Sequence, residues 1–470
     1  YKLIREQTFK KTDVWLIITN SFIFYAFGYS ILTGYQEGDI WLGLFTAFNA
    51  GLHFSAAALI YRSGLPDKNL FYLVTGLGLT FLTITIPVEL EGNWITLLWV
   101  AEAALLFWIG RSQTVGFYEK MSHPILSLAF ISLLIDWDAA YPLYRIENSE
   151  TGFPFLFNIH FFTSLFFIAG LSLVVWTDFQ KKKRGLLYRN DAINRLMQKM
   201  IWLVFIVSVY FAFRLEILGL FRNIFVESKM ALSGESLPGA LETGNRDLLR
   251  FGSIWAMNYT MLFVSLLSLA SVRWLSRNDI AIILFTGVVI TVVMFLDEGL
   301  SELTVLKDHY FNPGLNDPFD PGVWHIMIRY ISFLFLGFMF YPTGLLVKQK
   351  NKSSFLDISY DALLYVTLLW ILSNELILWL DVAAVNNPEE LWLTIFWGVY
   401  ALSIVAAGIK FGKKHLRLGA ILLLGITLAK LFFFDISELD TIAKTIVFVS
   451  LGILLLTASF LYNKFKNKMT

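Results

Sequence analysis

The segment "NWITLLWVAEAALLFWIGR", residues 93–111, decides the fold class of this chain. A helix needs about 20 mostly apolar residues to cross a bilayer, and this segment has that length and composition. A strand of a membrane β-barrel would instead be about ten residues long, with strict alternation of apolar and polar side chains. Because comparable runs recur from end to end, the sequence predicts an all-α integral membrane protein.

We predict about 14 transmembrane helices arranged as repeated helical hairpins. With no Pro/Ser-rich linker between the apolar runs, residues 1–470 are expected to form a single polytopic membrane domain. Since the first residue is Tyr1 rather than Met, we expect this to be the C-terminal part of a longer chain. The predicted spans are 13–34, 41–61, 69–87, 94–110, 120–136, 154–176, 199–219, 250–274, 279–297, 324–347, 359–380, 391–409, 417–434 and 441–463.

The composition supports a lipid environment and excludes several kinds of site. The chain is 57% hydrophobic and 16% charged, with a mean hydropathy of +0.63, whereas soluble domains carry about 25% charged residues. It has no cysteine, which excludes disulfides, thiolate metal sites and cysteine nucleophiles. No nucleotide-binding glycine motif and no HExxH motif occurs. We therefore expect no cofactor and no dedicated metal site, and the net charge of +1 gives no reason to expect a nucleic-acid partner.

The charge distribution predicts the orientation. Most of the 37 Lys and Arg residues fall in the termini and in alternate loops, and such loops stay on the cytoplasmic side. Both termini are then cytoplasmic, in a multi-pass protein of the bacterial inner membrane. The basic segment 180–199, "QKKKRGLLYRNDAINRLMQK", is expected to lie as a helix on the cytoplasmic leaflet. The carboxylates are skewed toward the opposite face.

An internal repeat links two distant hairpins. Residues 391–410, "LWLTIFWGVYALSIVAAGIK", align with residues 93–111 without gaps. In this alignment Trp94, Thr96, Trp99, Ala103 and Gly110 meet Trp392, Thr394, Trp397, Ala401 and Gly408. The same pattern predicts that each outward-going helix ends in a carboxylate, at Glu89, Asp136, Glu216, Asp297 with Glu298, Glu375 or Asp381, and Asp435.

Ionisable residues inside a bilayer are functional candidates because they cost at least ~2.5–3.5 kcal/mol. Glu102 is one, and it is in line with polar positions on the other inward-going helices, so these faces are expected to enclose an outward-opening polar cavity. The alternative is plain hydrogen bonding between helices, worth ~0.6 kcal/mol each. We expect Lys430 to pair with an acid of the outer face. The candidate substrate-binding residues are Glu89, Glu102, Asp136, Glu216, Asp297, Glu298, Glu375, Lys430, Asp435, His53, His160, His325 and Arg329.

Two further features stay open at this point. His53, His160 and His325 lie on different inward-going helices, which leaves convergence on a metal or a haem as a minor alternative. Residues 220–249 and 298–323 are predicted to be long outer loops, and long loops in compact proteins are often functional. Either loop could equally pack as a lid without a ligand.

The closing segment from Leu416 to Phe465, with "IPVELEGNWITLLWVAEAALLFWIG" (86–110), resembles a bacterial family of large predicted membrane proteins known only as a domain of unknown function. Members of that family are usually longer, with a further membrane region and often a coiled coil upstream. The resemblance implies no activity, and the middle third of the chain departs from its pattern. It marks Pro87, Glu89, Trp94, Trp99, Glu102, Gly110, Arg417, Lys430, Asp435, Gly452 and Tyr462.

The expected function is envelope biogenesis or transport of a lipid-linked, glycan or other polar substrate through a carboxylate-lined cavity. A membrane-embedded transferase that acts on a lipid-linked substrate at the periplasmic face is the first alternative. A non-catalytic scaffold of a larger membrane protein complex is the second.

Overall fold

The structure is a computed structural model, and its described part is helical throughout. It describes residues 11–35, 38–62, 68–141, 154–179, 191–233, 244–274, 278–313, 319–350, 354–383, 389–431 and scattered residues between 433 and 460. Helices pair all backbone N–H and C=O groups within one segment, which a bilayer requires. Twelve helices in this part are long and apolar enough to cross a membrane. The all-α membrane class is thereby confirmed.

The number of spans stays a prediction. Helix α14 has 17 described residues, which is shorter than a typical span. The last predicted span, 441–463, falls mostly outside the described residues.

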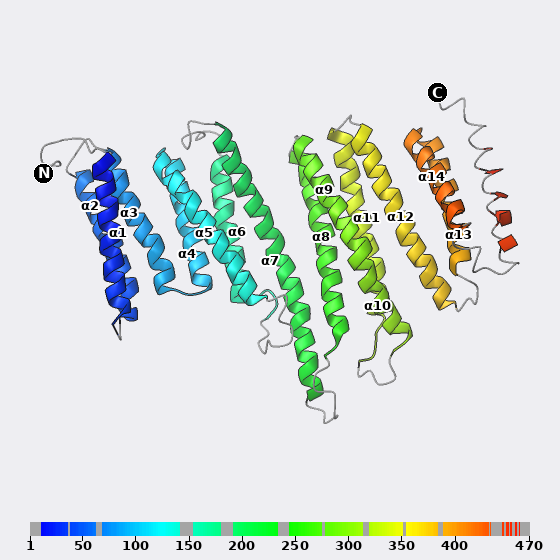
Figure 1. The fold of residues 1–470 in the computed structure, drawn as a ribbon, viewed down its shortest axis with the longest axis horizontal. Coiled ribbons are helices and arrows are strands. Elements are labelled where there is room, and N and C mark those ends of the chain that lie inside the picture. Colours follow the sequence, from blue (N-terminus) through cyan, green and yellow to red (C-terminus); the bar gives the residue numbers. More distant parts are fainter. Residues whose placement is uncertain are drawn as a thin grey trace. The chain divides into compact units, whose positions relative to one another are not determined.

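The chain divides into two compact units, residues 1–249 and 250–470, and each is described by itself. Among the residues that the structure describes, seven helices lie wholly within unit 1 (Figure 1). Within it, α2 packs on α3, α4 on both α5 and α6, and α6 on α7. The helices are α1 (Lys11–Thr33), α2 (Asp39–Arg62), α3 (Lys68–Glu89), α4 (Asn93–Ser112), α5 (Gly116–Ala140), α6 (Ile159–Phe179) and α7 (Asp191–Ser233).

Unit 2 begins within α8, and α13 packs most closely on α14. Helix α9 continues through a wide π turn, η2, into α10. The helices are α8 (Arg246–Trp274), α9 (Asn278–Met294), η2 (Phe295–Gly299), α10 (Leu300–Phe311), α11 (Trp324–Lys350), α12 (Ser354–Val382), α13 (Glu389–Lys410) and α14 (Lys414–Lys430).

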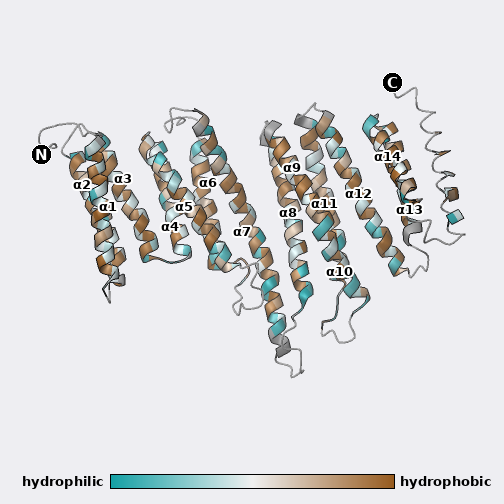
Figure 2. Cartoon of the chain, in the orientation of Figure 1, coloured by the Kyte–Doolittle hydropathy of each residue, from teal (hydrophilic) through white to brown (hydrophobic). Residues whose placement is uncertain are grey.

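Apolar side chains cover the outside of the helices as well as their contacts. Trp15, Leu105, Trp108 and Leu422 are all more than 40% exposed. Figure 2 shows hydrophobic residues along most of each helix. A soluble helix would carry an apolar stripe on one side only, so lipid is the fitting solvent for these surfaces.

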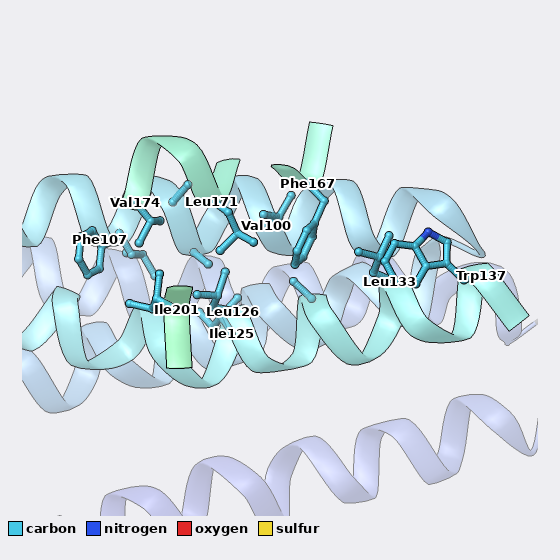
Figure 3. Close-up of a cluster of buried hydrophobic side chains, with 14 of the residues drawn as sticks. Val100, Phe107, Ile125, Leu126, Leu133, Trp137, Phe167, Leu171, Val174 and Ile201 are labelled. Carbon is cyan, nitrogen blue, oxygen red and sulfur yellow. The ribbon is translucent and has the colours of Figure 1, made fainter. Parts of the chain in front are cut away.

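The core of unit 1 lies between α4, α5 and α6. Val100, Phe107, Leu133, Phe167 and Leu171 are at most 1% exposed and belong to one cluster (Figure 3). Small residues allow this packing, since a Cβ at Gly170 would come within 2.8 Å of a Val100 methyl group. The cluster fixes the relative positions of the three helices that carry Thr96, Asp136 and His160.

The prediction that residues 220–249 and 298–323 are long loops is wrong for the parts of them that are helical. Helix α7 runs to Ser233 and α10 to Phe311, so much of 220–249 and most of the first half of 298–323 is helical. In α10, Leu300, Leu303 and Leu306 recur at helical spacing and are at most 3% exposed. Because these leucines are buried against other residues, the chain stays helical after Asp297 and Glu298. The predicted basic helix 180–199 can be compared with the structure only in part. Residues 180–190 lie outside the described residues, and residues 191–199 form the start of α7 rather than a separate helix.

The prediction that helices end at the acids holds at Glu89 and at Asp381, which lies one residue before the end of α12, and it fails at Glu216 and at Asp297 with Glu298. Glu89 is the last residue of α3. Glu216 lies inside α7, Asp297 and Glu298 lie in the π turn of a helix that continues, and Glu375 lies inside α12. A carboxylate can lie within a helix when other side chains or backbone groups donate hydrogen bonds to it. Glu216 and Glu375 both have such donors, so the helix need not end at them.

The turn between α4 and α5 and the turn between α13 and α14 make the same hydrogen bonds. Val115 N–H donates to Gly110 O and Lys413 N–H donates to Gly408 O, both at 2.9 Å. The residue before each donor has a left-handed φ, 57° at Thr114 and 66° at Gly412. These features agree with a duplicated hairpin, although the repeat itself stays a prediction. We call the membrane end of each unit that holds these turns the basic end, and the opposite end the acidic end.

Candidate functional site

The Glu216 carboxylate is the most completely bonded acid of unit 1. Its side chain comes from the middle of α7, and the residue is 2% exposed. Oε1 accepts hydrogen bonds from the Tyr141 hydroxyl and from Asn158 Nδ2, the latter at 2.8 Å. Oε2 accepts one from the Leu156 N–H at 2.8 Å. Three donors thus hold this one carboxylate in place.

Local backbone and side-chain properties keep this arrangement in place. Leu156 has φ 62°, a left-handed conformation that a residue with a Cβ adopts only when its surroundings impose it. Burial raises the pKa of Tyr141 above its ordinary value of 10.0, and the hydrogen bond and charge of Glu216 raise it further. Tyr141 therefore stays a protonated donor at physiological pH.

Asp136 from α5 lies beside this group and is bonded from α4. Its Oδ2 accepts a hydrogen bond of 2.6 Å from the Thr96 hydroxyl. The Ser132 hydroxyl lies 2.6 Å from the same Thr96 oxygen. Thr96 is fully buried and Asp136 is 8% exposed. Ser132 can donate to Thr96 while Thr96 donates to Asp136, so the proton count fits an ionised Asp136.

His160 from α6 lies near enough to both carboxylates for their charges to act on its ring. Its Nδ1 lies 3.3 Å from Asn93 Nδ2, and its ring meets the edge of the Tyr141 ring at 6.3 Å between centroids. Both Asp136 and Glu216 act electrostatically on the imidazole. We call this set, contributed by α4 to α7 and the segment before α6, the Glu216 network; its members are Asn93, Thr96, Asp136, Tyr141, Leu156, Asn158, His160 and Glu216.

Unit 2 has a polar cluster of its own. Arg329 of α11 is 1% exposed. Its Nε donates to Glu375 Oε1 and its Nη2 to Asn374 Oδ1, both on α12. The Tyr330 hydroxyl lies 3.3 Å from Glu375 Oε2. The structure thus brings together two predicted residues, Arg329 and Glu375, as a buried ion pair.

Glu102 stands apart from both groups. It lies on the α4 face that meets α3, where its Oε1 is 2.9 Å from the Thr83 hydroxyl. Its Oε2 is buried and has no hydrogen-bond partner in the described part of the chain. Trp99, one turn away, donates from Nε1 to the Thr83 carbonyl at 3.0 Å.

Two predicted residues have ordinary structural partners. His53 donates from Nδ1 to the Asn49 carbonyl at 2.7 Å, and its Nε2 lies 3.0 Å from Ser21 Oγ. Lys430 Nζ donates to Thr394 Oγ1 at 3.3 Å, so a threonine of the neighbouring helix is one partner where only an outer acid was expected.

The remaining predicted residues are not brought together. Glu89, Asp297 and Glu298 are exposed, and Asp435 lies outside the described residues. His325 lies in unit 2, where its ring is 6.0 Å from that of His309. Two imidazoles at this distance could ligate one ion, so the expected absence of a metal site stays a prediction.

The sequence analysis missed the partners that make the Glu216 network. Tyr141 and Thr96 carry no motif, and only their depth along the helices, level with Asp136 and His160, could have indicated them. It also missed a cluster at the basic end of unit 1. There Arg111, which is 5% exposed, pairs with Glu119 at 2.6 Å and with Asp178 at 2.9 Å.

Comparison with known proteins gives a family and no characterised relative. No curated protein and no solved structure matches the chain. One family model matches residues 7–465, which is nearly the whole chain, and its description states membrane location without an activity. The chain therefore belongs to the family described as "Predicted membrane protein (DUF2339)".

Proposed function

We propose that unit 1 binds a polar substrate, lipid-linked or a glycan, at the Glu216 network, in transport or envelope biogenesis. The observation that carries the proposal is the convergence of Asp136, His160 and Glu216 from three helices that are long enough to span a membrane. Ionisable side chains at such depth are costly and are retained mostly for function. Each of the two carboxylates is also held by buried donors, which fixes its position.

The members of the network would have different roles. Glu216 accepts from three donors, so it serves mainly to position Tyr141, Asn158 and the segment at Leu156. Asp136 receives one hydrogen bond, from Thr96, whereas a carboxylate can accept about four. Its remaining acceptor capacity suits the hydroxyl groups of a sugar. We therefore assign substrate contact to Asp136 and His160, and support to Glu216.

The orientation belongs to the same proposal. If the basic ends face the cytoplasm, as the Lys and Arg distribution indicates, the Glu216 network faces the other side. In a bacterial inner membrane that side is the periplasm, where lipid-linked glycans are assembled and moved.

One observation favours a second candidate, the transferase. The charges of Asp136 and Glu216 act on the His160 imidazole, and an imidazole beside carboxylates can serve as a general base. His160 would then remove a proton from an acceptor hydroxyl while the lipid-linked group is transferred. A scaffold would need neither Asp136 nor His160.

A binding measurement separates these readings. The full chain, in nanodiscs, is titrated with a polyprenyl diphosphate-linked oligosaccharide and followed by native mass spectrometry. Asp136→Asn should weaken binding at least about tenfold, ~1.4 kcal/mol. Asp138→Asn is the matched control, since Asp138 is an exposed acid on the same helix, and it should bind like the wild type.

The other outcomes are equally informative. Unchanged binding by Asp136→Asn, or no binding by the wild type, overturns the proposal. Formation of a transferred product, lost in His160→Gln, identifies the transferase.

A further inference from the structure

Glu102 has a hydroxyl as its single bonded neighbour, as Asp136 does, but the hydroxyl beside Glu102 also lies at hydrogen-bond distance from a backbone carbonyl. Its Oε1 is 2.9 Å from Thr83 Oγ1, and its Oε2 is buried without a hydrogen-bond partner. Glu102 makes no ion pair with any described residue. An ionised carboxylate so placed would be desolvated and uncompensated, which is among the most costly arrangements in a membrane.

The protons around Thr83 do not suffice for an ionised Glu102. The Thr83 hydroxyl lies 2.9 Å from the Leu79 carbonyl and 2.9 Å from Glu102 Oε1. A hydroxyl has one proton, whereas an ionised carboxylate and a carbonyl can only accept. If Glu102 is protonated, its O–H donates to Thr83 Oγ1 and Thr83 donates to Leu79 O. Both short contacts are then hydrogen bonds.

The repeat gives independent support. In the gapless alignment of the two hairpins, Tyr400 takes the place of Glu102. The Tyr400 hydroxyl donates at 2.7 Å to the carbonyl of Tyr365, on the helix that precedes its own. A neutral O–H donor that faces the preceding helix is therefore the group found at this position in unit 2. Protonated Glu102 supplies the same kind of group in unit 1.

Two other acids of unit 1 have donors without such a shortage of protons. Glu216 has three donors and Asp136 has the donor chain from Ser132 through Thr96. The titratable groups on the helices packed against α4 have partners of their own or lie at helix ends: Glu119 and Asp178 pair with Arg111, His123 stacks on Phe107, His160 lies by Asn93, and Glu89 is exposed at the end of α3.

A metal cation fits the position less well than a proton. Hard cations take about six oxygen ligands. Near Glu102 the structure offers the carboxylate and the Thr83 hydroxyl, while the Thr83 carbonyl already accepts from Trp99 Nε1 at 3.0 Å. A proton needs only one acceptor, and Thr83 Oγ1 provides it.

We propose that Glu102 is a reversible proton-binding site within the membrane part of unit 1. In the bound state the carboxyl is neutral and donates to Thr83. Release of the proton breaks this hydrogen bond and leaves one negative charge on the carboxylate, and no other covalent bond changes. If unit 1 transports the substrate proposed above, this proton is the one that couples the transport to a proton gradient. The coupling rests on the proposed function, but the proton site does not.

Carbodiimide labelling tests the site directly. Dicyclohexylcarbodiimide adds to protonated carboxyls in apolar surroundings, and the adduct is located by peptide mass spectrometry on the full chain in nanodiscs. The Glu102 peptide should be labelled at neutral pH, and labelling should fall about tenfold per pH unit once the carboxyl ionises. Glu102→Gln should reduce labelling of this peptide to background, while the Asp136 and Glu216 side chains stay unlabelled in both proteins.

Infrared spectroscopy provides the second measurement. A protonated carboxyl has a C=O band that shifts in D₂O, and Glu102→Gln should remove one such band. Because glutamine is neutral and can donate to Thr83, this variant should keep the thermal midpoint of the wild type, so that loss of the band is not a consequence of unfolding. Glu102→Asp, with a shorter reach, should keep the carboxyl band but shift its position.

Three results overturn the proposal: no labelling and no carboxyl band between about pH 5 and pH 9, labelling unaffected by Glu102→Gln, or protection by sodium at constant pH, which would identify a sodium site. Failure here leaves oligosaccharide binding at Asp136 as it was. Conversely, a labelled Glu102 in a protein that binds no oligosaccharide would retain the proton site and reject the proposed function.

Discussion

The Tyr141 hydroxyl and the Glu216 carboxylate form a hydrogen bond between a buried neutral donor and a buried charge. Bonds to charged groups contribute more to stability than neutral ones, about 1.5–3 kcal/mol. The donor and the acceptor come from α5's C-terminal end and from α7, so the bond also joins two helices.

Removing this donor should destabilise unit 1. Tyr141→Phe is expected to lower the free energy of unfolding by about 1.5–3 kcal/mol, because Glu216 would lose one of three donors while it stays buried. The thermal midpoint in detergent measures the effect. Tyr61→Phe is the matched control, since Tyr61 is 78% exposed. Equal midpoints for the two variants would contradict the assigned bond.

The same residue should make stability depend on alkaline pH. The folded state raises the pKa of Tyr141 above its ordinary value of 10.0, so the folded state holds the proton more tightly than the unfolded state. The stabilisation is complete below pH 10 and is lost as the pH rises toward the folded-state pKa. Between about pH 9.5 and pH 11, the midpoint of the wild type should fall more steeply than that of Tyr141→Phe. Parallel curves would show that Tyr141 does not titrate differently in the two states.

Single residues were predicted from the sequence where they carry a charge or an imidazole in an apolar run. Glu102, Asp136, Glu216 and Arg329 stand out in this way. Their partners Thr96, Tyr141 and Asn374 could not be predicted because hydroxyl and amide side chains are common in membrane helices, and their pairing depends on which helices are neighbours.

At the scale of elements, the α4–α5 turn and the α13–α14 turn have the same backbone conformation but different residues at the left-handed position. Both need a left-handed residue after the first helix of the hairpin, and α4 uses Thr114 where α13 uses Gly412. For an L-residue with a Cβ this conformation costs about 1–2 kcal/mol. A Cβ at Gly412 would meet no atom within 4 Å, so only the backbone conformation opposes a side chain there.

The turns should therefore respond oppositely to exchange. Thr114→Gly is expected to raise the free energy of unfolding by about 0.5 kcal/mol, after the greater chain entropy of glycine is subtracted. Gly412→Thr should lower it by about 1–2 kcal/mol. Chemical unfolding in mixed micelles gives both values. A loss of stability in Thr114→Gly would mean that the threonine side chain has a role that its contacts do not explain.

Helices were predicted well from apolar runs, and their ends were not. A run of apolar residues reports the part of a helix inside the lipid, whereas α7 and α10 continue beyond it. In α10 the continuation depends on Leu303 and Leu306 packing against the rest of unit 2, and the π turn at Phe295–Gly299 passes two acids without ending the helix.

At the scale of the whole molecule, the orientation can be tested with unusually little preparation. The chain has no cysteine, so any introduced cysteine is unique. Lys120→Cys and Lys414→Cys place exposed thiols at the basic ends of the two units, and Asp138→Cys and Asp297→Cys place them toward the acidic ends.

An impermeant maleimide added to intact spheroplasts should label Asp138→Cys and Asp297→Cys but not the two lysine variants, because basic loops stay in the cytoplasm. The lysine variants should become labelled after lysis. Labelling of a lysine variant together with an aspartate variant in intact cells would reject the orientation, and with it the periplasmic position of the Glu216 network.

The ion pairs of Arg111 indicate that one cation can act first in membrane insertion and later in helix packing. While helices are being inserted, in the orientation that we propose, Arg111 is one of many positive charges that keep a loop from crossing. Once the helices pack, Glu119 of α5 and Asp178 of α6 neutralise it, and it links three helices. Many other cations also favour the same orientation during insertion, so loss of Arg111 would leave the membrane orientation unchanged. No other described residue pairs with both Glu119 and Asp178, so the same loss would weaken the packing of the helices.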